Sequence, residues 1–126
     1  MMKLFLLDAG GAGLYFAALV VFTIIAVSAE AIVMLLMKYN KAGKAFLDSF
    51  LVNLGSLVAG YLLLAITGTV FNLTTSAALN ILILYVLTVA VESLLLYLLN
   101  RGYPVKKTVL VCIVMNLLTY LILYLF

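Results

Sequence analysis

Four long apolar runs, separated by short polar segments, dominate the pattern of the chain. The runs cover approximately residues 14–37, 45–69, 78–99 and 108–126. About 20 helical residues, each rising 1.5 Å, cross a hydrocarbon layer of roughly 30 Å, and the runs are about that long. The pattern therefore predicts four transmembrane helices.

Residues 1–13 precede the first run and contain Gly10, Gly11 and Gly13. A cleavable signal peptide would be followed by polar mature sequence, whereas here a complete spanning run follows directly. We therefore expect an interfacial lead-in with a glycine hinge at residues 1–13. A single transmembrane domain would then follow at residues 14–126.

The composition agrees with a membrane protein. Hydrophobic residues make up 69% of the 126 residues and charged residues only 9%, whereas a soluble domain is about 25% charged. A soluble core is excluded, and the lipid bilayer is the expected surrounding. The predicted fold class is an all-α integral membrane protein, a four-helix transmembrane bundle.

The basic residues indicate an orientation. Six of the seven lie in two short loops, at residues 38–44 and 101–107. Two spans separate these loops, so both lie on one side of the membrane, and the positive-inside rule makes that side cytoplasmic. We expect both termini outside, in a bacterial or archaeal cytoplasmic membrane. No basic face on a folded domain indicates a nucleic-acid partner.

The two halves of the chain, about residues 14–69 and 78–126, share a pattern of rare polar residues. Glu30 precedes Asn53 by 23 residues, and Glu92 precedes Asn116 by 24. A hydroxyl residue, Ser56 or Thr119, follows each Asn by three positions. The pattern predicts an internal repeat of two helical hairpins with the same orientation, related by an axis along the membrane normal.

The two Glu and two Asn residues form the candidate site. Each lies eight or nine residues from a basic residue of the adjacent loop, roughly 12–14 Å along a helix. All four side chains are therefore expected at one level near the bilayer midplane. Supporting roles are predicted for the two hydroxyl residues of the repeat, and for Thr88 and Tyr85, which share the helix of Glu92: Ser56, Thr119, Thr88, Tyr85.

A membrane-embedded Glu costs about 2.5–3.5 kcal/mol on insertion scales. No Lys or Arg lies inside a predicted span to neutralise Glu30 or Glu92. Because burial disfavours the charged form of a carboxyl, we expect at least one of them to be neutral and hydrogen-bonded to Asn. Asp48, by contrast, is placed in the first turn of its helix, near the headgroups.

The polar layer has two interpretations. In one, Glu and Asn only fix the register of packed helices. In the other they form an ion, proton or partner site, the usual role of intramembrane acids. The sequence has no His and a single cysteine, Cys112, and no phosphate loop or metal cluster, so we expect neither an enzyme nor a cofactor or metal.

Two functions remain open. The first is proton- or cation-coupled transport or ion conduction, carried out as a homo-oligomer because four helices seldom enclose a pathway. The second is a noncatalytic accessory or assembly subunit, whose acids contact other membrane protein subunits.

Overall fold

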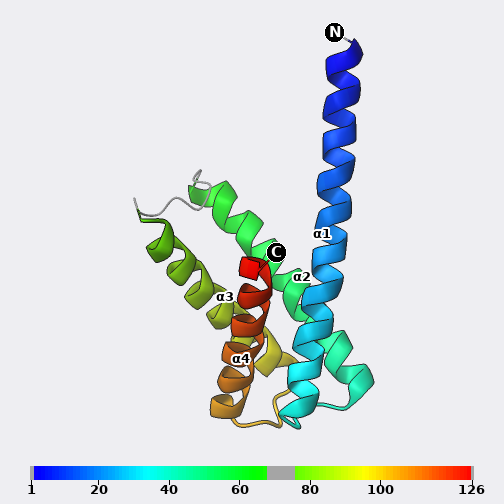
Figure 1. The fold of residues 1–126 in the computed structure, drawn as a ribbon. Helices are drawn as coiled ribbons and strands as arrows, with labels where there is room; N and C mark the ends of the chain where they lie inside the picture. The colour runs from blue at the N-terminus through cyan, green and yellow to red at the C-terminus, as the bar shows by residue number, and fades with distance from the viewer. Residues whose placement is uncertain (1, 68–75, 126) are drawn as a thin grey trace.

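The computed structural model describes residues 2–67 and 76–125, which form four helices (Figure 1). Their bounds are α1 Met2–Leu36, α2 Ala42–Thr67, α3 Ala77–Leu99 and α4 Val105–Leu125. All four are long and apolar enough to cross a membrane. The prediction of an all-helical chain with four helices suited by length and composition to spanning a membrane is confirmed. The expected end of the second span at residue 69 and most of the loop after it lie outside the described residues.

Local sequence explains where the helices begin and end. Lys38 has a φ of 51°, the left-handed conformation that commonly follows a helix C-terminus. Ser76 caps α3, since its Oγ accepts a hydrogen bond from the Leu79 amide at 3.4 Å. Pro104 immediately precedes α4, where a residue without an N–H is tolerated. The helix begins at Val105, so Lys106 and Lys107 belong to its first turn and not to the loop.

The N-terminal helix has no break at the expected glycine hinge. Helix α1 runs without interruption through Gly10, Gly11 and Gly13. In apolar surroundings a helix satisfies its own backbone hydrogen bonds, and this outweighs the conformational freedom of glycine. Whether residues 2–13 lie at the membrane interface stays a prediction.

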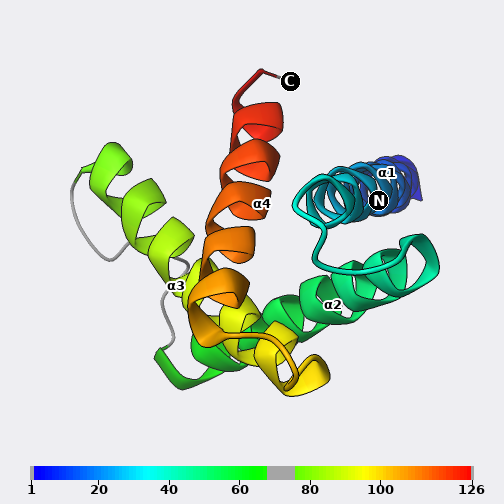
Figure 2. The same ribbon diagram turned by 90° about the horizontal axis from the view of Figure 1, so that it is seen from below.

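The helices form a ring of four neighbours. Helix α1 packs against α2 and α4, and α3 packs against the same two helices, while the diagonal pairs do not touch within the described residues. The loops at residues 37–41 and 100–104 lie together at the bottom of Figure 1, with Met2 at the opposite end. We call these the loop end and the far end. Seen from below, α1 points nearly along the view and the other helices are inclined to it (Figure 2).

The buried core lies toward the loop end. It includes Met34, Tyr39, Leu96, Val111 and Met115, each fully buried. Large apolar side chains are exposed along all four helices, a surface that suits lipid and that soluble monomers rarely present. The tightly packed part of the bundle therefore lies between the loops and the polar residues described next.

Candidate functional site

Glu30 of α1 is buried among polar groups of two neighbouring helices. Its side chain is 1% exposed. The carboxyl accepts hydrogen bonds from the Ser49 hydroxyl at 2.8 Å, the Thr119 hydroxyl at 3.2 Å and the Asn53 amide. Ser49 and Asn53 belong to α2 and Thr119 to α4, so Glu30 joins three helices.

Glu92 of α3 has corresponding surroundings. It is also 1% exposed, and it accepts a hydrogen bond of 2.6 Å from Asn116 Nδ2 and one of 3.0 Å from Ser56 Oγ. Asn116 comes from α4 and Ser56 from α2. The structure therefore brings the four predicted site residues together, joined by Ser56 and Thr119, the two hydroxyl residues of the predicted repeat. We name this set the carboxylate layer: Glu30, Ser49, Asn53, Ser56, Glu92, Asn116, Thr119.

The contacts of the layer are reciprocal between the two hairpins. Within each hairpin, the Asn donates to the Glu of the same hairpin. Between hairpins, Ser56 donates to Glu92 and Thr119 donates to Glu30. Helices α2 and α4 each present an Asn to one acid and, about one turn later, a hydroxyl to the other.

Both Asn side chains are oriented by their own helices. Asn53 Nδ2 donates to the Ser49 carbonyl at 2.9 Å, and Asn116 Nδ2 donates to the Cys112 carbonyl at 3.1 Å. An amide nitrogen carries two hydrogens. One therefore holds the side chain against its helix while the other reaches the carboxyl.

The layer contains acids without a basic partner. Within the described residues the one ion pair joins Lys44 to Asp48, and no Lys or Arg pairs with Glu30 or Glu92. All five side chains bonded to the two carboxyls donate to them. This arrangement suits an ionised carboxylate, because its oxygens only accept hydrogen bonds. The charge of two carboxylates would thus be unbalanced inside the chain.

A cavity of about 730 Å³ adjoins the layer on its far-end side. All four helices contribute to its lining. Examples are Leu19 and Thr23 of α1, Leu57 of α2, Thr88 of α3 and Tyr120 of α4. Asn53 and Ser56 line the cavity, and each is bonded to a buried carboxyl. We call this part of the lining, next to the carboxylate layer, the floor of the cavity. The cavity thus lies next to the acids, separated from the loop end by the buried core.

No family model, no curated protein and no solved structure matches this chain. What the molecule can do is therefore decided by the chemistry of its own side chains.

Within the described residues, the Thr88 and Tyr85 side chains form no hydrogen bond with either acid. The Thr88 hydroxyl donates to the Leu84 carbonyl at 2.8 Å and lies 3.4 Å from the Tyr120 hydroxyl. Tyr85 donates to the Ile113 carbonyl at 2.9 Å and packs edge-on against Tyr120. Thr88 and Tyr120 line the cavity, and Tyr85 acts on it through its ring contact with Tyr120.

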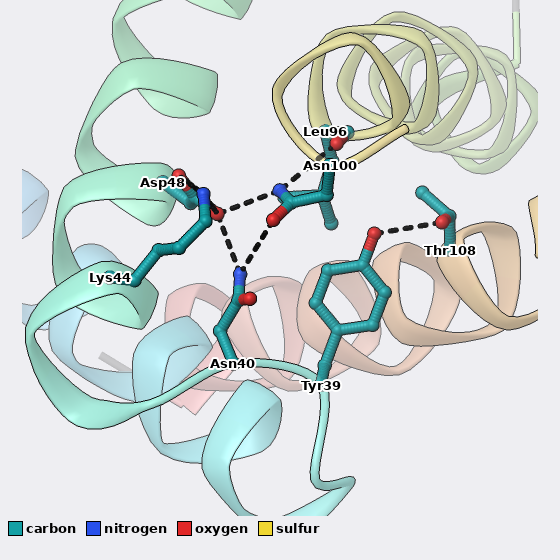
Figure 3. A network of polar contacts seen from close by, with 7 residues as sticks. All are labelled: Tyr39, Asn40, Lys44, Asp48, Leu96, Asn100 and Thr108. Carbon is teal, nitrogen blue, oxygen red and sulfur yellow. Dashed lines mark hydrogen bonds and ion pairs between the residues drawn. The ribbon is translucent and has the colours of Figure 1, made fainter. Parts of the chain in front are cut away.

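Asp48 has a place that the sequence interpretation missed. It is the seventh residue of α2, beyond the first turn, and it is 1% exposed. Its carboxylate accepts hydrogen bonds from Asn40 at 2.6 Å, from Asn100 at 2.7 Å and from Lys44 at 2.9 and 3.0 Å (Figure 3). The expected position in the first turn of the helix is wrong, and these three donors satisfy the carboxylate. Whether Asp48 lies at the depth of the headgroups stays a prediction.

Tyr39 completes the contacts at the loop end. Its side chain is fully buried, and its hydroxyl lies 2.8 Å from the Thr108 hydroxyl (Figure 3). Its ring stacks on Tyr103 with centroids 4.4 Å apart. Burial raises the pKa of Tyr39, so the hydroxyl keeps its proton at neutral pH. We name the following set the loop-side network: Tyr39, Asn40, Lys44, Asp48, Asn100, Thr108.

One sequence signal could have indicated this network. Lys44 and Asp48 are four residues apart, the spacing at which helical side chains of opposite charge meet. Their pairing directs the Asp48 carboxylate toward the loop end of α2. The contacts with Asn40 and Asn100 depend on how the two loops meet, which no local pattern contains.

Proposed function

We propose that this chain is a proton-coupled membrane transporter in which Glu30 and Glu92 exchange protons during the cycle. The observation that carries the proposal is the position of both acids. They are buried, they lack a basic partner among the described residues, and their donors Asn53 and Ser56 form the floor of a cavity. Intramembrane acids in such surroundings typically belong to ion, proton or substrate paths.

The difference between the two ends of the bundle supports transport over a purely structural role. A packing role needs only side chains that donate and accept across helices, and Ser or Asn would supply them. Here the layer separates a packed loop end from a cavity on the other side. A site closed on one side and accessible from the other is what alternating access requires of one of its states.

The reciprocal hydrogen bonds support the internal repeat and its parallel orientation. With both basic loops cytoplasmic and both termini outside, the far end and its cavity face away from the cytoplasm. The cavity is lined by helices of a single chain, so in this proposal one copy contains a complete site. A homo-oligomer then serves assembly and not the formation of the pathway.

Flux measurements test the proposal. The purified chain, reconstituted in liposomes with a pH gradient and a pH-sensitive dye inside, is expected to move protons. Glu30→Gln and Glu92→Gln should each abolish this movement, because Gln keeps a hydrogen-bond acceptor but cannot ionise. Asp8→Asn is the matched control, since it removes an acid from outside the layer and should leave the flux unchanged. Wild-type flux in the Glu30→Gln, Glu92→Gln double variant would refute the proposal.

Infrared spectroscopy gives an independent reading of the acids. We expect a carbonyl band of a neutral carboxylic acid at pH 7, lost in the Glu30→Gln, Glu92→Gln double variant and unchanged in Asp8→Asn. A neutral acid is expected because the bilayer interior disfavours a carboxylate without a counterion. If both acids are ionised in the purified protein, with no cation bound, this part of the proposal is wrong.

The accessory-subunit function remains as the second candidate, favoured by one observation. Along the whole of α3 only Glu92, Ser93 and Leu96 are buried, so most of this helix is available to a partner helix. A subunit would show no flux and would co-purify with a membrane protein in mild detergent.

A further inference from the structure

We infer that the cavity binds a hydrophobic organic ammonium ion, with its charged group at the floor and its apolar body between the helices. The inference rests on the proposed transport function and names the class of substrate that the same site takes. Three features of the cavity carry it: the chemistry of its floor, the chemistry of its walls, and its place relative to the acids.

The floor offers hydrogen-bond acceptors. Asn53 uses its amide hydrogens on the Glu30 carboxyl and the Ser49 carbonyl. The Ser56 hydroxyl points its hydrogen toward the Glu92 carboxyl or the Asn53 carbonyl, each 3.0 Å away. What both residues can present to a ligand is oxygen, an acceptor. A group that donates hydrogen bonds matches this floor, and an anion does not.

The acids behind the floor favour a positive charge. Glu30 and Glu92 each lie one hydrogen bond from the floor, and no basic residue in the described part of the chain pairs with either. A cation in the cavity would supply the missing counterion. An ammonium ion combines this charge with the donors that the floor requires.

The walls fit an apolar body. No charged side chain of the described residues lines the cavity. The hydroxyls of Thr23 and Thr88 donate to carbonyls of their own helices at 2.8 Å, so the hydroxyl hydrogens of these two wall residues are already used. The volume of about 730 Å³ lies within the range of roughly 300–1,000 Å³ typical of small-molecule sites.

Binding and proton release are then coupled. When the ammonium enters, the O–H bond of a neutral Glu breaks and the proton leaves to water. The net charge of the layer together with its ligand stays the same, because one cation replaces one proton. Return of the proton re-forms the neutral acid and releases the ammonium.

Three probes with the same phenylalkyl body and different charge test this inference. They are 4-phenylbutylammonium, the neutral 4-phenylbutanol and the anion 4-phenylbutyrate. Binding is measured by calorimetry on the full chain in nanodiscs, with empty nanodiscs subtracted to remove partitioning into lipid. We expect the ammonium to bind about tenfold or more tightly than either other probe. In weak buffer, a pH indicator should show protons released on binding.

Variants distinguish ammonium binding in the cavity from the proposed transport function. The Glu30→Gln, Glu92→Gln double variant should lose both the preference for the ammonium and the proton release, while Asp8→Asn should keep both. Equal binding of all three probes would overturn the inference and show an apolar cavity only. Proton release by Na⁺ but not by the ammonium would also overturn it. In either case proton flux in liposomes would leave the proposed function standing, whereas ammonium binding without any flux would refute transport and not the site.

Discussion

The loop end and the far end of this bundle hold their helices together in different ways. At the loop end, Asp48 receives hydrogen bonds from the α1–α2 loop and from Asn100 at the end of α3, and Tyr39 reaches Thr108 of α4. Beyond the carboxylate layer, the same helices surround a cavity of about 730 Å³. One end is closed by polar contacts between the hairpins, and the other is not filled.

The difference shows how a membrane bundle can be firm at one end and adaptable at the other. Lipid is as apolar as the helix surfaces, so hydrophobic burial does not drive spanning helices together, and close packing and polar contacts do so instead. Regions with few such contacts open at the lowest free-energy cost. The carboxylate layer lies between the packed loop end and the cavity of the far end. A change in its protonation could therefore affect the helix contacts at both ends.

Removing the acid of the loop-side network should destabilise the loop end more than any other change considered. Asp48→Ala leaves the buried amide of Asn100 and the partly buried amide of Asn40 without their shared acceptor. We expect a loss of about 3 kcal/mol, since hydrogen bonds to a charged group contribute about 1.5–3 kcal/mol each. The half-exposed Lys44 adds little, because exposed ion pairs are weak. Thermal unfolding in detergent measures this loss.

The native thiol reports whether Asp48→Ala also opens the loop end. Cys112 is the one cysteine of the sequence and is fully buried, one helical turn from both Thr108 and Asn116. Labelling by a water-soluble maleimide should accelerate by up to about 100-fold, the equivalent of about 3 kcal/mol. Asp48→Asn keeps one acceptor oxygen, so its labelling rate should lie between those of the unchanged chain and Asp48→Ala. Unchanged labelling would mean that this network does not close the loop end.

A smaller change to the same network should have a smaller effect. Tyr39→Phe removes the hydroxyl contact with Thr108 and keeps the ring that stacks on Tyr103. The expected loss is about 1 kcal/mol, the net contribution of one neutral hydrogen bond. Cys112 labelling should then rise about fivefold. A change as large as that of Asp48→Ala would show that the tyrosine, not the carboxylate, holds the two hairpins together.

Filling the far end should barely change stability. Ala59 lines the cavity and Val58, its neighbour on α2, is 51% exposed and does not. Ala59→Phe and Val58→Phe should each change the unfolding free energy by about 0.5 kcal/mol or less. Only Ala59→Phe should weaken binding of 4-phenylbutylammonium, measured in nanodiscs. Equal binding by both variants would place the ligand elsewhere.

The hydrophobic pattern was sufficient to predict the four helices and the meeting of the four site residues. Glu30, Glu92, Asn53 and Asn116 are rare polar residues in apolar runs, and apolar surroundings leave such groups few partners except one another. Their common level along the bundle could be predicted from the helical rise alone. Where a residue has few alternatives, the sequence is informative about its contacts.

Residues near the ends of the helices were harder to place. Asp48 and Tyr39 could equally have faced headgroups, and only the meeting of the two loops brings Asn40 and Asn100 to the same carboxylate. The cavity was also beyond prediction, because it depends on how α2 and α3 incline relative to α1 (Figure 1). Periodicity describes which face of a helix is buried and not the angle at which helices cross.

The reciprocal bonding of the carboxylate layer has a mechanical consequence. Asn53 and Ser56 of α2 hold different acids, and Asn116 and Thr119 of α4 hold the same two acids in the opposite order. A rigid movement of either helix therefore changes the hydrogen bonds of both carboxyls in one step. In the proposed transport cycle, the two acids would then respond as a cooperative pair. A proton bound at one would alter the free energy of proton binding at the other by the same amount in both directions.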